Sequence, residues 1–198
     1  MKALVVLTLT ALSLSPASDK FELKPYLFKS YERYIYDYRE VFRGVRNTGR
    51  FEIVIRKKGK EYEVTIGGRY REWEGVVSER FTDASEVAGF VLMKSYFNHH
   101  WLIPLTRTLF SKALVKVLRA KNLDLSPGVK KLDEDTLRVV RKCKVGGLSG
   151  RMIEILKGKE VVFRLCLSPY TSLPTYVYKK SEEGNLYEIK LLEYSDLK

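Results

Sequence analysis

Few side chains in this sequence have the types and spacing that catalysis requires. The only histidines, His99 and His100, are adjacent, so their side chains point apart on a helix or a strand, and no Cys, Asp or Glu accompanies them at metal-ligand spacing. No nucleophile-elbow motif, Walker loop, dinucleotide fingerprint or zinc motif is present. We therefore expect a protein that is not an enzyme and has no catalytic residue, metal or cofactor. A secreted hydrolase with one histidine as its base is the remaining alternative.

The first 17 residues are typical of a secretory signal peptide. Met1-Lys2 supplies positive charge, residues 3–14 are largely apolar, and Ser15-Pro16-Ala17 offers small residues for cleavage after Ala17. The apolar run is shorter than the roughly 20 residues that a membrane span needs, and no Cys follows it as a lipid-anchoring site. We expect a periplasmic or secreted protein whose single domain covers residues 18–198.

Cys143 and Cys166 are the only cysteines. An exported protein usually oxidises such a pair, and without a C-x-x-C motif the bond would be structural rather than catalytic. Turn signals at Gly146-Gly147 and Gly158-Lys159, however, place the two residues on strands that flank a third. That arrangement separates them by roughly 9–10 Å, whereas a disulfide joins Cα atoms at most roughly 7 Å apart.

The faces of these strands also argue against the bond. In a regular strand Cys143 shares a face with Val139 and Val145, whereas Cys166 shares one with Arg164. A β-bulge or a different strand order would still bring the two sulfur atoms together. The sequence thus leaves a disulfide between Cys143 and Cys166 open.

The chain is strongly basic, with 36 Lys and Arg against 24 Asp and Glu and a net charge of +12. A basic exported protein can contact anionic lipid headgroups, cell-wall polymer or nucleic acid. The charge is spread along the chain, as on an ordinary solvated surface, and no basic run is longer than Arg56-Lys57-Lys58. Interspersed charge and the absence of Gln also resemble the composition of thermophile proteins.

Alternation of apolar and polar residues predicts strands on both sides of a helical segment. In the first strand Tyr34, Tyr36 and Tyr38 share one face, while Arg33 and Arg39 lie on the other. Predicted turns at 47–49 and 58–60 separate the early strands, and a loop is expected over 122–135. About nine strands are predicted, over residues 31–42, 51–56, 61–66, 73–77, 137–145, 151–157, 161–167, 175–179 and 186–194.

The helical segment spans residues 83–121 and has two parts. The first opens with Asp83 three residues before Glu86, a helix-start signal, and is too apolar for a surface helix, so we expect it to be buried. The second begins at Pro104 with a regular apolar face. Its basic face would contact anionic headgroups, as a mobile lid, or would be an ordinary solvated surface; the residues concerned are Lys112, Lys116 and Arg119.

These elements predict an α+β fold, mainly β: a curled antiparallel sheet, an open half-barrel, wrapped around or capped by the helical insertion. The apolar face of the sheet would either hold an apolar ligand or pack solidly on the helices. Tyrosines interleaved with basic residues can also stack nucleobases. Here the tyrosines and arginines of the first strand lie on different faces, so nucleic acid is not favoured as a partner.

The order of elements and several short motifs resemble the lipoprotein-carrier (LolA/LolB-like) superfamily, nearest an uncharacterised family of exported bacterial envelope proteins. The motifs are Tyr36-Asp37-Tyr38, the segment 168–174, Tyr176-Val177-Tyr178, Gly184 and the final Leu191-Leu192-Glu193-Tyr194. The resemblance implies an open barrel with a helical lid that holds acyl chains in the periplasm. It assigns no functional residue.

We therefore expect an exported non-enzymatic protein that binds a lipid or an acylated partner, with transient membrane contact and a role in envelope biogenesis or lipid transport. The alternative is an interaction module with a filled core, which acts through its basic surface on envelope polymers or a protein partner. Face alternation predicts that the ligand cavity would be lined by Tyr34, Tyr36, Tyr38, Ile53, Ile55, Tyr62, Val64, Trp73, Phe90, Leu92 and Tyr178.

Overall fold

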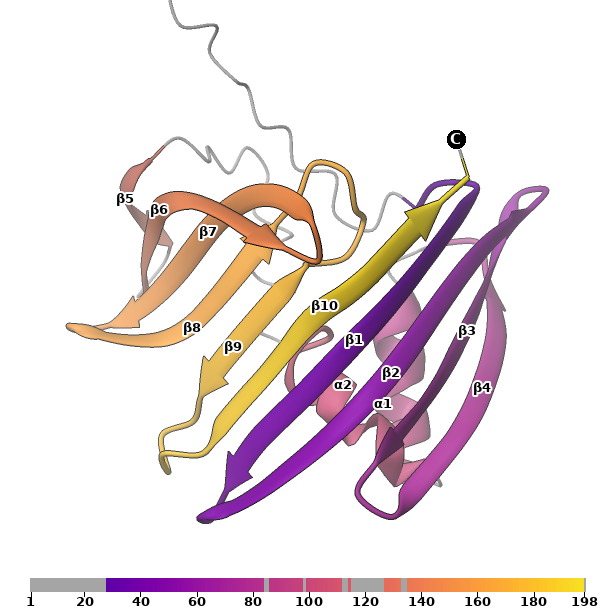
Figure 1. Cartoon of the computed structure of the whole chain (residues 1–198), viewed down its shortest axis with the longest axis horizontal. Helices are drawn as coiled ribbons and strands as arrows, with labels where there is room; N and C mark the ends of the chain where they lie inside the picture. The colour runs from indigo at the N-terminus through magenta and orange to yellow at the C-terminus, as the bar shows by residue number, and fades with distance from the viewer. Residues whose placement is uncertain are drawn as a thin grey trace, which may run out of the picture.

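The structure, a computed structural model, describes residues 28–83, 86–97, 99–111, 114, 127–132 and 135–197. The predicted signal peptide lies outside this part of the chain. The described residues form one antiparallel sheet, and the helices, which follow β4 in the sequence, lie against one of its faces (Figure 1). In chain order the elements are β1 (Tyr31–Phe42), β2 (Val45–Lys58), β3 (Glu61–Tyr70), β4 (Trp73–Phe81), α1 (Glu86–Phe97), the 3-10 helix η1 (His100–Leu102), α2 (Ile103–Arg107), β5 (Gly128–Leu132), β6 (Asp135–Val145), β7 (Leu148–Lys157), β8 (Glu160–Leu167), β9 (Tyr176–Lys180) and β10 (Leu186–Asp196).

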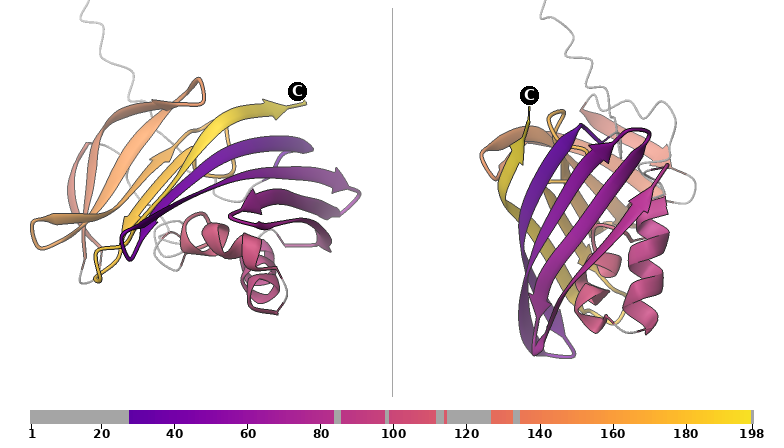
Figure 2. Two further views of the ribbon diagram at one scale, coloured as in Figure 1. Left: turned by 60° about the horizontal axis from the view of Figure 1, so that its bottom comes forward. Right: turned by 90° about the vertical axis from the view of Figure 1, so that its right-hand side faces the viewer.

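The two halves of the sheet are joined by its first and last strands. The strand order is β4-β3-β2-β1-β10-β9-β8-β7-β6-β5, so the pairing of β1 with β10 connects the early meander to the later hairpins. Strands β4 and β5 are the two edges, and the sheet remains open. Helices α1 and α2 cover one face of β1–β4 (Figure 2). The predicted fold class, a mainly β open sheet with a helical insertion, is confirmed.

Strand β1 has the predicted bounds, but the turn predicted at 47–49 and the loop predicted over 122–135 were wrong in part. The turn after β1 is formed by Arg43 and Gly44, which have φ values of 50° and 80°, and β2 already begins at Val45. The predicted turn at 47–49 lies within β2. Strand β5 lies in the region predicted as a loop, and it makes ten strands among the described residues rather than about nine.

The helical insertion begins as predicted and then departs from the prediction. The backbone N–H of Glu86, the first residue of α1, donates to the carbonyl oxygen of Asp83 at 3.1 Å. Helix α2 ends at Arg107 rather than running on from Pro104 to 121, and residues 108–110 form a turn. The Thr108 hydroxyl donates to the Pro104 carbonyl oxygen at 2.7 Å, a bond that competes with the helical ladder. Lys112, Lys116 and Arg119 lie outside the described residues.

The two faces of the sheet differ in character. We call the face that contacts the helices the helix face and the opposite one the outer face. The helix face of the meander packs against apolar residues of the insertion, including Val87, Phe90 and Leu105, in a single core cluster. The same cluster continues along the later strands through residues such as Ile153 and Leu165.

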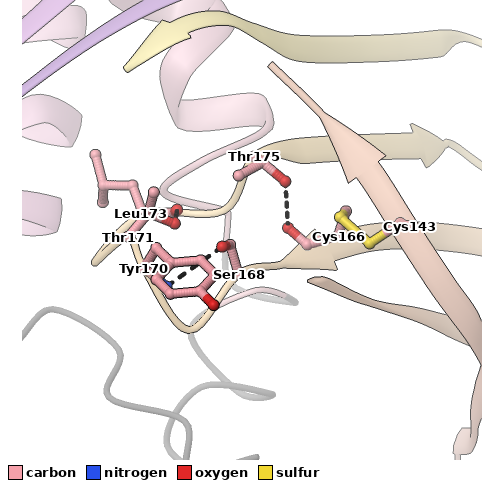
Figure 3. Close-up of a disulfide and its surroundings, with 7 residues drawn as sticks. All are labelled: Cys143, Cys166, Ser168, Tyr170, Thr171, Leu173 and Thr175. Atoms are coloured by element: carbon pink, nitrogen blue, oxygen red, sulfur yellow. Dashed lines mark hydrogen bonds between the residues drawn. A yellow bond between two sulfur atoms is a disulfide. The ribbon is translucent and has the colours of Figure 1, made fainter. Parts of the chain in front are cut away.

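The disulfide that the sequence left open is present between Cys143 and Cys166, with the Cα atoms 6.2 Å apart (Figure 3). The objection based on strand faces fails because β6 contains a bulge. Val139 pairs with Ile153, but after the register shift Cys143 pairs with Gly150. A bulge reverses the alternation of side chains, so Cys143 lies on the outer face.

The objection based on the distance between the two Cα atoms fails because β7, the strand between the cysteines, has a glycine where the bond crosses it. Cys166 pairs with Met152 of β7, two residues from Gly150, so both cysteines lie on the same face of β7. A Cβ atom at Gly150 would lie 3.2 Å from the Cys166 sulfur and 2.2 Å from the Leu167 carbonyl oxygen. The absence of a side chain at this position lets the bond cross β7.

Candidate binding surfaces

The tyrosine row of β1 lies on the helix face and is fully buried. Tyr34, Tyr36 and Tyr38 have no accessible surface. The rings of Tyr34 and Tyr36 are stacked, with their centroids 5.9 Å apart, and the Tyr36 hydroxyl donates to the Pro174 carbonyl oxygen at 2.8 Å. The row is therefore a packed part of the core whose polar ends are hydrogen-bonded.

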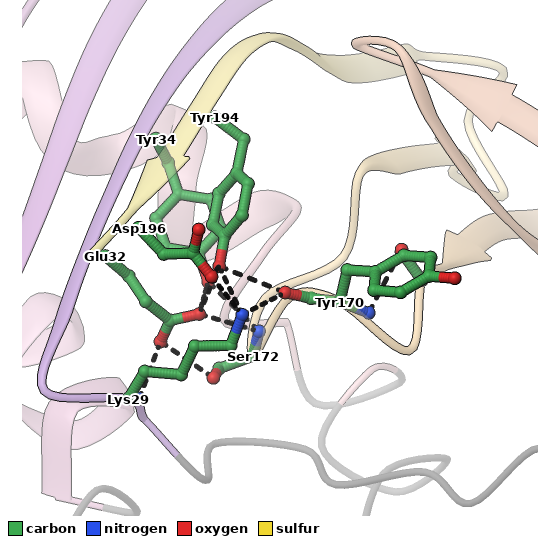
Figure 4. A network of polar contacts seen from close by, with 8 residues as sticks. Lys29, Glu32, Tyr34, Tyr170, Ser172, Tyr194 and Asp196 are labelled. Carbon is green, nitrogen blue, oxygen red and sulfur yellow. Dashed lines mark hydrogen bonds and ion pairs between the residues drawn. The ribbon is translucent and has the colours of Figure 1, made fainter. Parts of the chain in front are cut away.

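A buried carboxylate, Glu32, lies at one end of this row (Figure 4). Its Oε1 atom accepts hydrogen bonds from the hydroxyls of Tyr34 at 2.7 Å and Tyr194 at 3.1 Å. Its Oε2 atom accepts one from the Ser172 hydroxyl at 2.8 Å. The Lys29 ammonium donates to the Tyr194 hydroxyl at 3.1 Å. The network connects β1, β10 and the loop before β9.

A second buried carboxylate, Glu40, lies at the other end of the row. The hydroxyls of Tyr38 and Tyr70 donate to it, the former at 2.8 Å. The guanidinium groups of Arg71 and Arg107 pair with it at 3.0 and 2.9 Å. Burial would raise the pKa of Glu40, but the hydrogen bonds from Tyr70 and Tyr38 and the charge of Arg107 outweigh it and hold that pKa below its ordinary value.

The residues predicted to line a ligand cavity are divided by the structure. Six of them have at most 1% accessible surface and are therefore packed in the core. These residues are Tyr34, Tyr36, Tyr38, Ile53, Ile55 and Val64. Phe90 is also buried, against Phe81, with ring centroids 5.4 Å apart. Tyr62 is half-buried at the margin of the core.

Two of the predicted lining residues do not lie on the buried face, and a third, which pairs with the buried Tyr70, lies at its edge. Leu92 is 47% exposed, because it follows directly after the buried pair Phe90 and Val91 and the helix turns it away from the sheet. Tyr178 is next to the buried Val177 on β9, so it points to the outer face, where the Arg164 guanidinium lies 5.7 Å from its ring centroid.

Trp73, the third of these residues, lies with the two histidines at the edge of the helical insertion. Trp73 is 36% exposed, at the start of β4, and its ring centroid is 5.6 Å from that of His100. The ring of His99 lies 6.2 Å from that of the buried Trp101. Among the residues that the structure describes, no group of three or more His, Cys, Asp and Glu residues could hold a metal ion.

Helix α1 exposes a group of large apolar side chains that the sequence analysis expected to be buried. Leu92, Met93, Tyr96 and Phe97 are 47%, 54%, 75% and 75% exposed, and we call them the α1 apolar surface. Their spacing of i, i+1, i+4 and i+5 places them on one side of the helix, where Leu92 and Tyr96 lie opposite Phe90 and Val87. Phe97, the last residue of α1, follows Phe90 by two turns and lies at the edge of this side. Residue type alone favoured burial, whereas the spacing shows a helix that is apolar on both sides. No described helix is long and apolar enough to span a membrane.

Among the described residues, two hollows on the outer face are lined mainly by charged residues. One has a volume of about 550 Å³, lies over β1–β3, and is lined by Asp37, Arg46, Asn47, Thr48, Gly49, Arg50, Arg69, Arg71 and Glu72. The other has a volume of about 480 Å³, lies over β6–β10, and is lined by Arg138, Val140, Lys144, Val145, Met152, Glu154, Arg164, Tyr176, Glu188 and Lys190.

In the second hollow the acidic residues already have partners. Arg138 pairs with Glu154 through its Nε atom at 3.0 Å, and Arg164 pairs with the same carboxylate at 2.9 Å. Burial raises the pKa of Tyr176, as do the charge of Glu188 and a hydrogen bond to it. Arg138 and Arg164 therefore hold Glu154 in place, and Tyr176 holds Glu188.

No protein-family model matches the chain, and no curated protein matches it. Among solved structures it is similar to the Pseudomonas aeruginosa MucA/MucB complex, with 14% identity, a TM-score of 0.43, and 83% of this chain and 51% of that chain covered. It thus spans about half the length of that protein. It is also similar to a DUF1329 family protein from Desulfovibrio piger, with 14% identity, a TM-score of 0.25, and 86% of each chain covered.

A third similar structure is a putative outer membrane lipoprotein-sorting protein domain from Vibrio parahaemolyticus, with 8% identity, a TM-score of 0.26, and 87% of this chain and 86% of that chain covered. The resemblance to lipoprotein-sorting proteins suggested by the sequence is thus found among solved structures as well.

Proposed function

We propose that this chain is a non-enzymatic binding protein of the cell envelope that docks on lipid through the α1 apolar surface. The observation that carries the proposal is the exposure of Leu92, Met93, Tyr96 and Phe97 on one side of a single helix. Contiguous apolar side chains of this size are rare on the surface of a soluble protein and mark contacts with membranes or partners.

The chemistry of this surface suits the boundary of a bilayer. Phe97 and Leu92 offer apolar side chains to the acyl region, while Tyr96 combines an aromatic ring with a hydroxyl that remains hydrated at the headgroup level. Lys94 lies on the same helix, with its ammonium 5.7 Å from the Phe90 ring centroid, and the net charge of +12 favours anionic headgroups.

The filled core supports docking on the outside of the helix rather than enclosure under it. Ile53, Ile55 and Val64 have at most 1% accessible surface, so a ligand inside the sheet would need α1 to move away first. The predicted cavity residues then contact an acyl chain only in an opened state. Surface docking requires no such opening, because the α1 apolar surface is already exposed.

Vesicle flotation tests the proposal. The purified protein should float with phosphatidylcholine vesicles, and more strongly when phosphatidylglycerol is added. Replacing Tyr96 and Phe97 together by Ser should weaken partitioning at least roughly tenfold, since a fully buried large apolar side chain contributes roughly 1.5–3 kcal/mol. A matched variant with Val45→Ser and Tyr170→Ser, two exposed side chains distant from α1 in sequence, should float like the wild type.

Two results would contradict docking through α1. One is a Tyr96→Ser, Phe97→Ser variant that floats as well as the wild type while its circular dichroism spectrum is unchanged. The other is uptake of one fluorescent fatty acid per chain without any flotation, which would favour an enclosed ligand instead.

A further inference from the structure

The 550 Å³ hollow on the outer face of β1–β3 is rich in arginine. We call Arg46, Arg50 and Arg69, together with Thr48, the arginine groove. Arg46, Thr48 and Arg50 alternate along β2, so their side chains share the outer face. Arg69 comes from β3 and pairs directly with Arg50. The positions of these residues are thus fixed by two regular strands rather than by a loop.

The pairing of Arg50 with Arg69 has an electrostatic cost. Like charges directly opposite each other on adjacent strands are destabilising. In the same register Asp37 lies opposite Arg50 and Glu74 lies opposite Arg69, but among the described residues neither carboxylate forms an ion pair with these arginines. Asp37 accepts a hydrogen bond from Arg39 at 3.1 Å, and Glu40 takes up the charge of Arg71. Within the described residues Arg46, Arg50 and Arg69 make neither an ion pair nor a side-chain hydrogen bond.

The groove continues along the sheet toward the second hollow. On the outer face Lys190 of β10 pairs with Asp37 of β1, which in turn pairs with Arg50 and then Arg69. Three strand spacings separate Lys190 from Arg69, a span of roughly 14 Å. Lys190 also lines the 480 Å³ hollow. A ligand in the groove can therefore extend across β1 to further cationic groups.

We propose that the arginine groove binds the phosphate groups of an extended anionic polymer. A guanidinium group offers five N–H donors in a planar fork that matches phosphate oxygens in pairs. Thr48 adds a hydroxyl donor between Arg46 and Arg50. An anion bridging Arg50 and Arg69 would relieve their mutual repulsion, and a polymer would reach the cationic groups beyond Asp37. None of the groove's lining residues is aromatic, so the site provides no stacking surface for nucleobases.

Inorganic polyphosphate is the probe for this site. We expect the purified protein to bind it with an affinity that falls steeply as salt rises, because bound counterions are released. The double variant Arg50→Gln, Arg69→Gln should bind at least roughly tenfold more weakly and with a shallower salt dependence. Its Tm in the absence of polyphosphate should stay close to that of the wild type, because the repulsion between the two arginines is lost together with the attraction of Asp37 and Glu74, which lie opposite them.

The matched control is Lys60→Gln with Lys159→Gln, which removes the same charge from two exposed hairpin turns. This control should bind nearly as tightly as the wild type. Equal losses in the two double variants, or wild-type binding by the arginine variant, would overturn the proposal, because binding would then depend on net charge alone. Pyrophosphate bound as tightly as polyphosphate would overturn the polymer assignment. The assay contains no lipid, so it succeeds or fails independently of docking through α1.

Discussion

Two buried glutamates at the ends of β1 determine what the tyrosine row can do. Glu32, Tyr34, Tyr36, Tyr38 and Glu40 are spaced by two and share the helix face. The sequence showed this spacing, but a Glu is rarely fully buried, so only the tyrosines were expected there. What identifies the acids is the pairing of each with tyrosine hydroxyls, and this depends on Tyr70 and Tyr194, which are distant in sequence.

Replacing Glu40 by Gln should destabilise the protein by about 3 kcal/mol, because Arg71 and Arg107 would lose the buried carboxylate that they share. Urea unfolding measures the change. Glu63→Gln is the control, since Glu63 pairs with Lys58 near the surface, and surface ion pairs contribute little. A loss for Glu40→Gln no larger than that for Glu63→Gln would show that the buried cluster is not stabilising.

The stability that Glu40 provides should also depend on pH in a defined direction. Its pKa is held below the ordinary value of 4.5, so the folded state favours the ionised form. The stabilisation is therefore fully present above pH 4.5 and is lost as the pH falls through the lowered pKa. The difference in unfolding free energy between wild type and Glu40→Gln should shrink over that range. A difference that stays constant on acidification would contradict this assignment.

The strands show where the alternation of apolar and polar residues predicts structure and where it does not. Strand β1 was predicted with its bounds because its alternation of apolar and polar residues is regular. The start of β2 was missed because Asn47 and Gly49 resemble turn residues. Gly49 is instead required for close packing, since a Cβ atom there would lie 2.8 Å from the Arg69 carbonyl oxygen. A bulge such as that after Val139 leaves no mark in a single sequence, yet it decides the face on which Cys143 lies.

The disulfide should stabilise the later half of the sheet specifically. It closes a loop of 23 residues, so replacing Cys143 and Cys166 by Ser should cost about 3 kcal/mol. The bond joins β6 to β8 across β7. Amide hydrogen exchange should therefore become faster in these three strands and change little in β1–β3. Uniform acceleration across all ten strands would contradict a local role for the bond.

The molecule as a whole presents three surfaces with different chemistry. The described residues of β1–β3 on the helix face are packed in the core, the outer face is charged, and α1 carries apolar side chains toward solvent. The sequence predicted an apolar face against helices, and that is present. It could not show whether the sheet encloses a cavity, because a filled core and a lined cavity have the same alternation. Nor could it show that α1 exposes one of its two apolar sides, which depends on how the helix docks.

The most direct test of lipid docking places a tryptophan within the α1 apolar surface. Phe97→Trp should give blue-shifted fluorescence with phosphatidylcholine vesicles and should be quenched by brominated acyl chains, beyond the signal of the native Trp73 and Trp101. Val45→Trp, at an exposed site on β2, should show neither additional effect. If Phe97→Trp and Val45→Trp instead respond alike, or if Phe97→Trp stays unquenched in vesicles that the protein binds, the α1 apolar surface is not where lipid binds.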